Sequence, residues 1–160
     1  MNNRTDSERE KRIIAKLLEY KRKNEKVTDS EYAFTNVREA EALIKSDWNA
    51  FLFAVIFDQQ WPSEKAWAIP FELKNRLGHL DIYEISRSKD DDLVKVFNSP
   101  TVLHRYANKM ALWTKSASIK LVSEYNGKAE NIWADTKEAK VIIARFDDFD
   151  GIGQKKSTMA

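Results

Sequence analysis

The residues best placed to do chemistry lie near position 150, where two glycines and two lysines occur in the order Gly151-Ile152-Gly153-Gln154-Lys155-Lys156. Glycines permit positive φ and leave the backbone uncovered, while the apolar residue between them anchors the turn in a core. The amides then point outward at a helix start, where N–H groups and the helix dipole stabilise a phosphate. The two lysines add cations beside it. This pattern predicts a phosphate-binding hairpin, although an ordinary turn between helices explains the same glycines equally well.

Other candidate sites in the sequence are weak. There are only two histidines, His79 and His104, and no cysteine, so no metal centre, thiol chemistry or iron–sulfur cluster is expected. The run Asp90-Asp91-Asp92 fits the first turn of a helix better than a cation site. His104 and the following Arg105 suit either a DNA contact or packing at a helix end.

The composition indicates that helices position the hairpin. The chain has 160 residues, of which 42% are hydrophobic and 32% charged, with a formal net charge of +2. This length suits one domain with a moderate core, and the charge neither requires nor excludes a nucleic-acid partner. Four glycines and three prolines are few, which favours long helices over a sandwich or barrel of short strands. The sequence therefore predicts an all-α fold.

The sequence also bears on location. No uninterrupted apolar stretch approaches the roughly 20 residues of a membrane span, since the longest covers residues 50–57. The first residues include acidic side chains close by and contain no apolar segment of the kind that a secretion signal needs. We therefore expect a cytoplasmic protein that has no membrane partner.

Three regions are expected along the chain. Residues 1–26 form a charged amphipathic helix, residues 27–46 a connector and short helix, and residues 47–160 the main domain. Asn36 and Glu39 have capping-box spacing at the start of the short helix. The N-terminal helix is expected to pack onto the domain through one apolar stripe, which consists of Ile13, Ile14, Leu17 and Leu18.

Local signals divide the main domain into helices. Asp47 is the expected N-cap of a helix over residues 48–57, which is apolar nearly all round and should be the buried, central helix of the domain. Pro70 bends or divides the following helix, and Gly78 ends it. Ser88 is the expected cap of a short helix that starts with acidic residues.

Two longer patterns complete the expected set. One helix runs from about residue 102 to Tyr125, where Asn126 and Gly127 stop it. Thr136 caps the last full helix, whose inward residues are Ala139, Ile142, Ile143 and Phe146. The total is about eight helices and no strand.

The hairpin segment, residues 149–155, resembles that of the helix-hairpin-helix DNA glycosylase superfamily, the group of endonuclease III. Members of this family carry Leu-Pro-Gly-Val-Gly-x-Lys-x-Ala, so Phe149, Asp150 and Ser157 depart from the pattern. The resemblance implies a helical bundle of the glycosylase type that ends in the second hairpin helix. It also implies double-stranded DNA as the partner.

The resemblance extends upstream of the hairpin. The apolar helix that ends in Asp58-Gln59-Gln60 and the segment from Tyr106 to Lys109 keep the family's order and approximate spacing. The match covers about residues 47–160, and a separate bacterial branch of the superfamily is the most similar.

The family's roles carry over to matching positions. Gln60 aligns with a glutamine that enters the duplex where a base has flipped out and fills the gap. Gly151, Ile152, Gly153 and Gln154 are expected to bind the DNA backbone. A monovalent cation on the hairpin carbonyl groups is a further expectation, and no other cofactor is expected.

Lys155 aligns with the lysine that bifunctional members use for abasic-site lyase chemistry. A desolvated amine near cations has a lowered pKa and attacks the sugar C1′ as the base departs, which forms a Schiff base. Lys155 is therefore the expected catalytic residue, with a phosphate contact as the alternative. Lys156 is the expected DNA-binding neighbour, and it competes for the catalytic role if the register shifts by one.

Family catalysis also uses an aspartate about 18 residues beyond the hairpin lysine, and the sequence ends before that position. A longer protein, a second polypeptide that supplies the missing part, or a degenerate relative each fits this pattern. Asp147, Asp148 and Asp150 precede the hairpin and would oppose a phosphate. The expected function is base-excision repair as part of a DNA N-glycosylase. The alternative is a non-catalytic DNA-binding or helical protein-interaction module.

Overall fold

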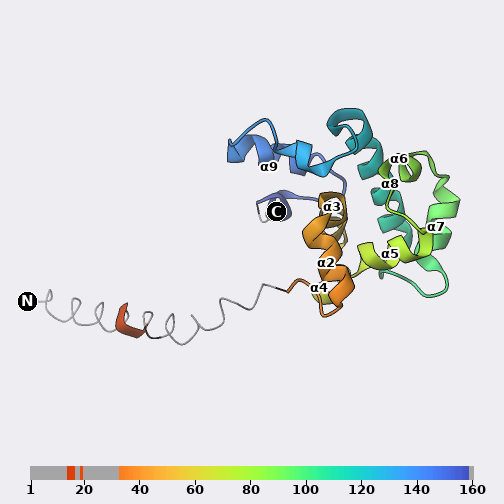
Figure 1. Cartoon of the computed structure of the whole chain (residues 1–160), viewed down its shortest axis with the longest axis horizontal. Coiled ribbons are helices and arrows are strands. Elements are labelled where there is room, and N and C mark those ends of the chain that lie inside the picture. The colour runs from red at the N-terminus through yellow and green to blue at the C-terminus, as the bar shows by residue number, and fades with distance from the viewer. Residues whose placement is uncertain (1–13, 17–18, 20–32, 159–160) are drawn as a thin grey trace, which may run out of the picture. The chain divides into compact units, whose positions relative to one another are not determined.

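A computed structural model describes residues 14–16, 19 and 33–158, and every regular element in these ranges is a helix (Figure 1). The all-α prediction is therefore confirmed for this part of the chain. Contacts divide the protein into two compact units, residues 1–33 and 34–160. The apolar stripe predicted for the N-terminal helix lies largely outside the described residues. Within the described ranges, no helix is both long and apolar enough to cross a membrane.

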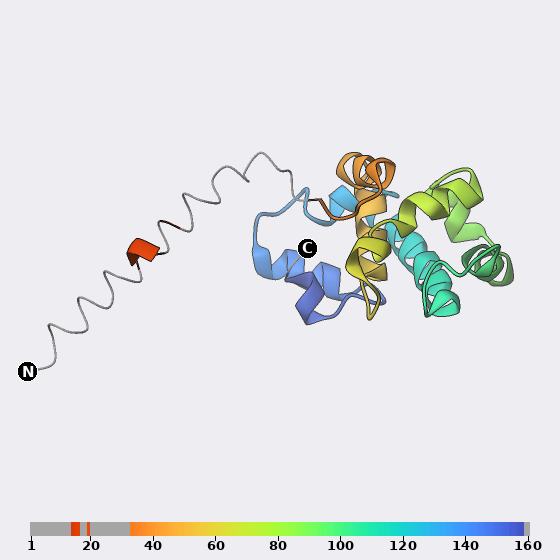
Figure 2. The same cartoon turned by 90° about the horizontal axis from the view of Figure 1, so that it is seen from below.

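Helix α3 (Trp48–Phe57) is the central helix of the second unit, as predicted. Its N-cap Asp47 accepts hydrogen bonds from the amides of Asn49 and Ala50, which satisfies two donors of the first turn. Figures 1 and 2 show α9 (Ala139–Asp147) and α10 (Gln154–Ser157) on one side of α3. The helices from α5 (Ile69–Leu77) to α8 (Ala107–Tyr125) lie on the other side. The prediction that α3 is buried on every side is wrong at its first turn, because Trp48 is 47% exposed.

Helix α2 (Arg38–Ser46) packs on α3 and on α5 (Ile69–Leu77). The predicted capping box at Asn36 is not formed, because the side-chain amide of Asn36 donates instead to Glu64. The carboxylate of Glu41 accepts from the amides of Phe34 and Thr35, so it secures the segment before the helix. The expected boundary at residue 46 separated residues 34–46 from the main domain. In the structure, these residues belong to the same compact unit as residues 47–160.

The predicted stop signals of the middle helices are confirmed. Pro70 lies in the first turn of α5 and separates it from α4 (Ser63–Ala66), and Gly78 ends α5 with φ +80°. Helices α6 (Ile82–Arg87) and α7 (Asp90–Asn98) follow. The predicted cap at Ser88 is wrong, because its hydroxyl donates backward to Ile85 at the end of α6.

Helix α8 (Ala107–Tyr125) ends at Asn126 and Gly127 as predicted, with both residues at positive φ. It begins at Ala107 instead of the predicted residue 102. Tertiary contacts explain the delay, because they occupy backbone groups that a longer helix would use. The guanidinium of Arg76 binds the carbonyl groups of Ser99 and Thr101, and His104 Nδ1 accepts from the amide of Tyr106.

The C-terminal part contains η2 (Ala129–Ile132), α9 (Ala139–Asp147) and α10 (Gln154–Ser157). Thr136 does not cap α9, since its hydroxyl accepts from the amide of Glu138 before the helix begins. Of the inward residues predicted for this helix, Phe146 is buried, whereas Ala139 is exposed. Helices α9 and α10 contact each other and enclose the hairpin.

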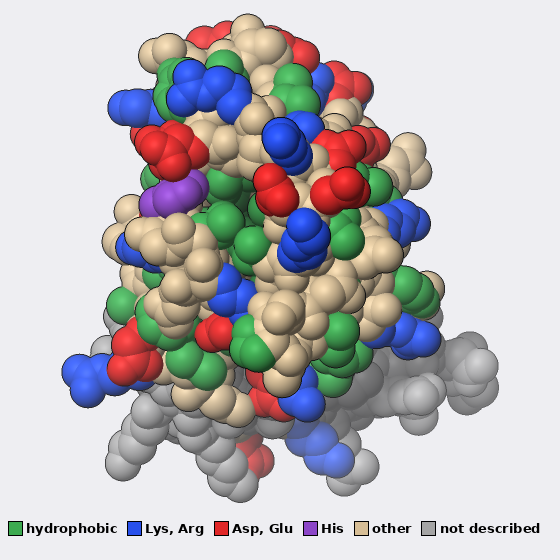
Figure 3. All heavy atoms as spheres, turned by 90° about the vertical axis from the view of Figure 1, so that its right-hand side faces the viewer, with side chains coloured by type: hydrophobic (Ala, Val, Ile, Leu, Met, Phe, Trp, Pro, Cys, Tyr) green, Lys and Arg blue, Asp and Glu red, His purple; other side chains and the backbone are tan. Residues whose placement is uncertain are grey.

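The face of the protein on the side of α6 and α7 mixes acidic and basic side chains (Figure 3). Asp90 and Asp92 of α7 pair with Lys115 and Lys95, which contributes to this mixture. A surface with both signs interspersed creates little net potential for a charged partner. The hairpin between α9 and α10 lies on the other side of α3 from this face.

Candidate functional site

The hairpin is a short, hydrogen-bonded turn between α9 and α10. The amide of Phe149 donates to Phe146 O at 3.1 Å, and the amide of Ile152 donates to Phe149 O at 3.0 Å. Both Phe149 and Ile152 are buried, so the turn is anchored in the core as the sequence predicted. Gly151 has φ +87°, a conformation that residues with a side chain rarely adopt.

The two hairpin glycines differ in their surroundings. A Cβ on Gly151 would lie 2.5 Å from Trp113 Cε3, so this glycine is required for packing against α8. A Cβ on Gly153 would meet nothing within 4 Å, and the residue is exposed. Gly153 therefore leaves the backbone open to a ligand, whereas the Cα of Gly151 is covered by the protein.

The amides that follow Ile152 are available to an anion. Among the described residues, no group accepts a hydrogen bond from the amides of Gly153, Gln154 or Lys155. The side chain of Lys155 is exposed beside them. Consecutive uncovered N–H groups next to a cation form the kind of concavity that binds phosphate.

The two lysines lie in different environments. Lys155 is exposed, whereas Lys156 is half-buried and its Nζ donates to Ile56 O and Gly151 O, each at 3.0 Å. Burial lowers the pKa of Lys156 to about 8, and the negative charge of Asp58 opposes this shift. The ammonium group therefore joins the end of α3 to the hairpin and loses its proton unusually easily.

Both lysines line a cavity of about 570 Å³. Five further residues line the cavity. They come from the segment just before α2, from α3 and its C-cap, and from the residue after α4: Phe34, Phe51, Val55, Asp58 and Trp67. Phe34 stacks on Trp67, with ring centroids 4.3 Å apart. Asp58 accepts hydrogen bonds from Trp67 Nε1 at 3.1 Å and from the hydroxyl of Ser63 at 3.3 Å, which orients its carboxylate.

Gln60 lies in the turn after α3 with φ +47° and is exposed. Its side-chain Oε1 accepts a hydrogen bond of 2.7 Å from the hydroxyl of Tyr106. Arg105 donates to the backbone carbonyl of Gln60 at 3.3 Å, and its guanidinium lies over the Tyr106 ring. With its oxygen occupied, the amide of Gln60 presents its NH₂ group to a partner.

His104 binds the backbone of Tyr106, whose hydroxyl in turn binds Gln60. The residue is fully buried, its ring lies 5.4 Å from that of Trp61, and its Nδ1 accepts from the Tyr106 amide at 3.0 Å. Burial lowers its pKa, while the nearby backbone carbonyl groups of Phe57 and Gln59 partly oppose the shift. Of the two roles considered for His104, the structure supports packing at a helix end.

Contacts along α8 connect Gln60 with the hairpin. Lys109 lies one turn beyond Tyr106, and its Nζ is 4.4 Å from the ring centroid of Trp113. Trp113 in turn covers Gly151. Tyr106, which binds Gln60, is therefore followed along α8 by Lys109 and by Trp113, which packs on the hairpin.

The acidic residues before the hairpin, Asp147, Asp148 and Asp150, are exposed. Asp150 accepts a hydrogen bond of 2.7 Å from the hydroxyl of Ser116 on α8, which stabilises the turn. Within the described ranges, the carboxylates of Asp147 and Asp148 accept no hydrogen bond and form no ion pair. Their charges would repel a phosphate that approached from the α9 side.

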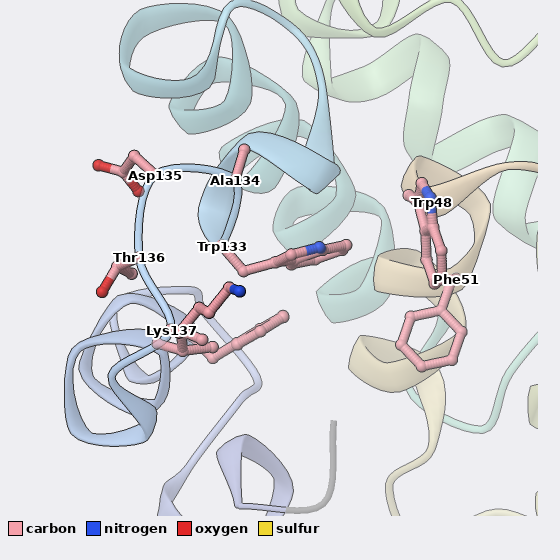
Figure 4. Close-up of a pocket in the computed structure, with 9 residues that line it drawn as sticks. Trp48, Phe51, Trp133, Ala134, Asp135, Thr136 and Lys137 are labelled. Carbon is pink, nitrogen blue, oxygen red and sulfur yellow. The ribbon is translucent and has the colours of Figure 1, made fainter.

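A second cavity, of about 730 Å³, opens between α3 and the loop before α9 (Figure 4). Figure 4 shows Trp48 and Phe51 on one side of it and Trp133 on the other, and Phe146 also lines it. The rings of Trp133 and Phe146 stack with centroids 6.1 Å apart. Trp133 is half-buried and lines this aromatic groove.

Sequence reasoning missed both cavities. The signal was present in Trp48, Phe51 and Val55, which follow one another at helical spacing and line the two openings. An all-apolar helix gives no sign of which face is left uncovered. Among the residues that the structure describes, no group of three His, Cys, Asp or Glu could hold a metal ion.

Comparisons with known proteins add no family. No protein-family model, no curated protein and no solved structure matches this chain.

Proposed function

We propose that the protein binds double-stranded DNA through the hairpin and acts in base-excision repair as part of a DNA N-glycosylase, in the cytoplasm. The observation that carries this proposal is the run of uncovered amides at Gly153, Gln154 and Lys155. Gly153 has open space around its Cα, so a phosphate can approach the backbone closely. A phosphate there would gain the amide dipoles and the charge of Lys155.

Gln60 supports the same proposal from a second position. Its side chain is exposed, held by Tyr106, and connected to the hairpin through α8. A polar, planar group oriented in this way can enter the gap that a flipped base leaves and bind the unpaired partner base. The aromatic walls of the cavity beside Lys155 and Lys156 offer surfaces for stacking a base or a sugar.

Duplex binding tests the proposal. Fluorescence anisotropy with a labelled duplex at low salt should show binding that weakens steeply as salt rises. Gly153→Asp places a carboxylate where the phosphate would lie, and we expect it to weaken binding at least about tenfold. Circular dichroism should show an unchanged helix content, because Gly153 has φ −102° and open surroundings.

The matched control is Lys95→Glu on α7, which changes the net charge more than Gly153→Asp does. Lys95 is exposed and lies on the face with mixed charges. We therefore expect the duplex affinity of Lys95→Glu to stay within about twofold of the wild-type affinity. Equal losses for both variants would show a general effect of charge and would refute the hairpin as the contact.

Gln60 gives a second prediction. Tyr106→Phe removes the hydrogen bond that orients the Gln60 amide, which is worth about 1 kcal/mol. We therefore expect about fivefold weaker binding to a duplex with a central abasic site and unchanged binding to an intact duplex. Tyr83→Phe is the control, because this hydroxyl binds Asn126 O at the far end of α8. If wild type and Tyr106→Phe bound each of the two duplexes with equal affinity, Gln60 would not be part of the DNA contact.

A non-catalytic interaction module is the second candidate function. The aromatic groove of about 730 Å³ and the exposed Trp48 favour it, because uncovered aromatic surface is typical of protein-binding sites. The exposed carboxylates of Asp147 and Asp148 favour it as well. Absence of duplex binding at low salt would support this candidate over the first.

A further inference from the structure

We propose that one face of α3 and the loop before α9 form a docking groove for an acidic amphipathic helix of a partner protein. The floor of this α3 groove is the row Trp48, Phe51 and Val55, which lie on one face of α3 at helical spacing. The proposal names a partner for the interaction module, the second candidate function. It does not rest on the DNA contact of the hairpin.

The two cavities of the structure meet at Phe51, so the α3 groove is continuous. Phe51 lines both the cavity of about 730 Å³ and the cavity of about 570 Å³. Trp48 belongs to the first cavity and Val55 to the second, and these residues are about 10 Å apart along the axis of α3. This length is about two helical turns, the span of three anchor side chains in a bound helix.

Aromatic rings cover the floor and the walls of the α3 groove. The ring of Trp48 lies edge-to-face with those of Phe51 and Trp133, with centroids 5.9 and 5.3 Å apart. Phe51 in turn lies edge-to-face with Trp67, 5.5 Å away. Figure 4 shows Trp48 and Phe51 on one side of the first cavity and Trp133 on the other. Because Trp48 is about half-exposed, the groove has the uncovered aromatic anchor that is typical of protein-binding hot spots.

The α3 groove presents cations and hydrogen-bond donors that lack partners in the described part of the chain. The ammonium groups of Lys137, at the first cavity, and Lys155, at the second, are exposed and form no ion pair there. The indole N–H groups of Trp48 and Trp133 donate to no described residue either. Carboxylates of a partner can accept from all four groups, so the groove favours acidic side chains beside apolar ones.

The carboxylates that line the α3 groove do not cancel this preference. Asp135 accepts two hydrogen bonds from the guanidinium of Arg145, which lowers the pKa of this carboxyl below its usual value. Asp58 accepts from Trp67 Nε1 at 3.1 Å, and its charge acts on the ammonium of Lys156. The exposed carboxylates at the end of α9 line neither cavity. Both groove carboxylates are therefore compensated within the protein.

A helix suits this groove better than an extended segment. A helix satisfies its own backbone N–H and C=O groups, so its apolar side can enter an aromatic hollow without leaving polar groups unpaired. An extended peptide binds by adding a strand to a sheet edge, and the described part of the chain contains no strand. The expected partner carries apolar side chains three or four positions apart on one face, with Asp or Glu beside them.

Peptide binding to the full chain tests the proposal. The probe is a fluorescein-labelled peptide of three heptads, with Leu at the first and fourth positions and Glu and Ala elsewhere. One matched peptide carries Lys in place of Glu, and another keeps the acidic composition in a scrambled order without an apolar face. Fluorescence anisotropy at low salt should show at least about tenfold tighter binding of the acidic helix than of either control. Equal binding of the acidic helix and the scrambled peptide would overturn the proposal.

Variants of the groove locate the contact. Trp48→Ala removes the exposed ring and should weaken binding of the acidic peptide at least about tenfold. Lys137→Glu should weaken it about fivefold through repulsion. The matched control is Leu112→Ala, an exposed apolar residue of α8 outside both cavities, which should stay within about twofold. Unchanged affinity in both groove variants would overturn the proposal.

Circular dichroism of each variant controls for unfolding. If Trp48→Ala unfolds, Lys137→Glu decides, because this side chain is exposed and forms no ion pair with a described residue.

Two other occupants of the groove are outcomes of the same experiment. A synthetic peptide of residues 6–24, which has more basic than acidic side chains, is compared with the acidic peptide. Tighter binding of this peptide would make the occupant a segment of this chain and overturn the proposal. Dimerisation of the chain without peptide, lost in Trp48→Ala, would make the occupant a second copy and overturn it as well.

The proposals fail in different ways. Binding of the acidic peptide without duplex binding would refute the hairpin as a DNA contact and retain the α3 groove. Duplex binding that Gly153→Asp weakens, without any peptide binding, would refute the groove and retain the hairpin. Trp48-dependent binding that prefers the basic helix would refute the acidic partner and retain an interaction module.

Discussion

Replacing Gly151 with alanine is expected to lower the free energy of unfolding by about 2–4 kcal/mol. The backbone at Gly151 has φ +87°, which is strained for any residue with a Cβ. The new methyl group would also lie 2.5 Å from Trp113 Cε3 and 3.3 Å from Ile56 Cγ2. The contact with Trp113 involves a ring packed against the hairpin, so relief requires the turn or the ring to move.

Urea denaturation followed by circular dichroism measures this effect, with Gly153→Ala as the matched control. Gly153 has φ −102°, and a Cβ at this position would meet nothing within 4 Å. The free energy of unfolding of Gly153→Ala should therefore stay within about 0.5 kcal/mol of the wild-type value. Similar losses at both positions would mean that the hairpin glycines do not differ as the structure indicates.

Loss of Arg76 is the second change with a large expected effect. Its Nη1 lies 2.8 Å from the carbonyl oxygens of Val96, Ser99 and Thr101, and its Nε pairs with Glu72. One side chain therefore joins α5 to the loop between α7 and α8. Arg76→Ala leaves these carbonyl groups without their charged donor, so we expect a loss of about 2–4 kcal/mol.

Arg76→Lys should recover less than half of that loss, because a single ammonium cannot reproduce the planar set of donors. The control is Arg87→Ala, which removes an exposed arginine at the end of α6 and should change stability by less than about 0.5 kcal/mol. Thermal and urea unfolding should agree for each variant. A stability of Arg76→Ala equal to that of Arg87→Ala would show that the loop carbonyl groups are satisfied by water.

The contacts of the hairpin couple its stability to the position of Lys156. Gly151 O accepts one of the two hydrogen bonds from Lys156, and Ile56 O accepts the other. A shift of the turn in Gly151→Ala would therefore change the position of Lys156 as well as the free energy of unfolding.

Much of the fold could be predicted from the sequence because many helix boundaries depend on local chemistry. Asp47 caps α3 through its own side chain, and Gly78 and Gly127 end helices at positive φ. These residues act on the backbone within one turn of themselves, so their effect does not depend on distant partners. The three aspartates at the start of α7 also act locally, because their charges stabilise the positive end of the helix dipole.

Boundaries that depend on distant groups were predicted wrongly. Asn36 has the chemistry of a cap, but its amide reaches Glu64, 28 positions along the chain. The start of α8 depends on Arg76 and on the buried ring of His104, which use backbone groups that local patterns assign to the helix. Propensity is a weak prior where a tertiary partner offers a stronger bond.

The hairpin shows both kinds of determinant. Two glycines around an isoleucine, followed by lysines, already determine a tight turn whose apolar residue is buried, because these properties belong to the residues themselves. Only the tertiary structure decides that Trp113 covers Gly151 while Gly153 stays open. It also decides that Lys156 is half-buried against α3 while Lys155 is exposed. The physical reason is that burial and desolvation depend on how the hairpin packs against α3 and α8, which adjacent residues of one chemical type cannot reveal.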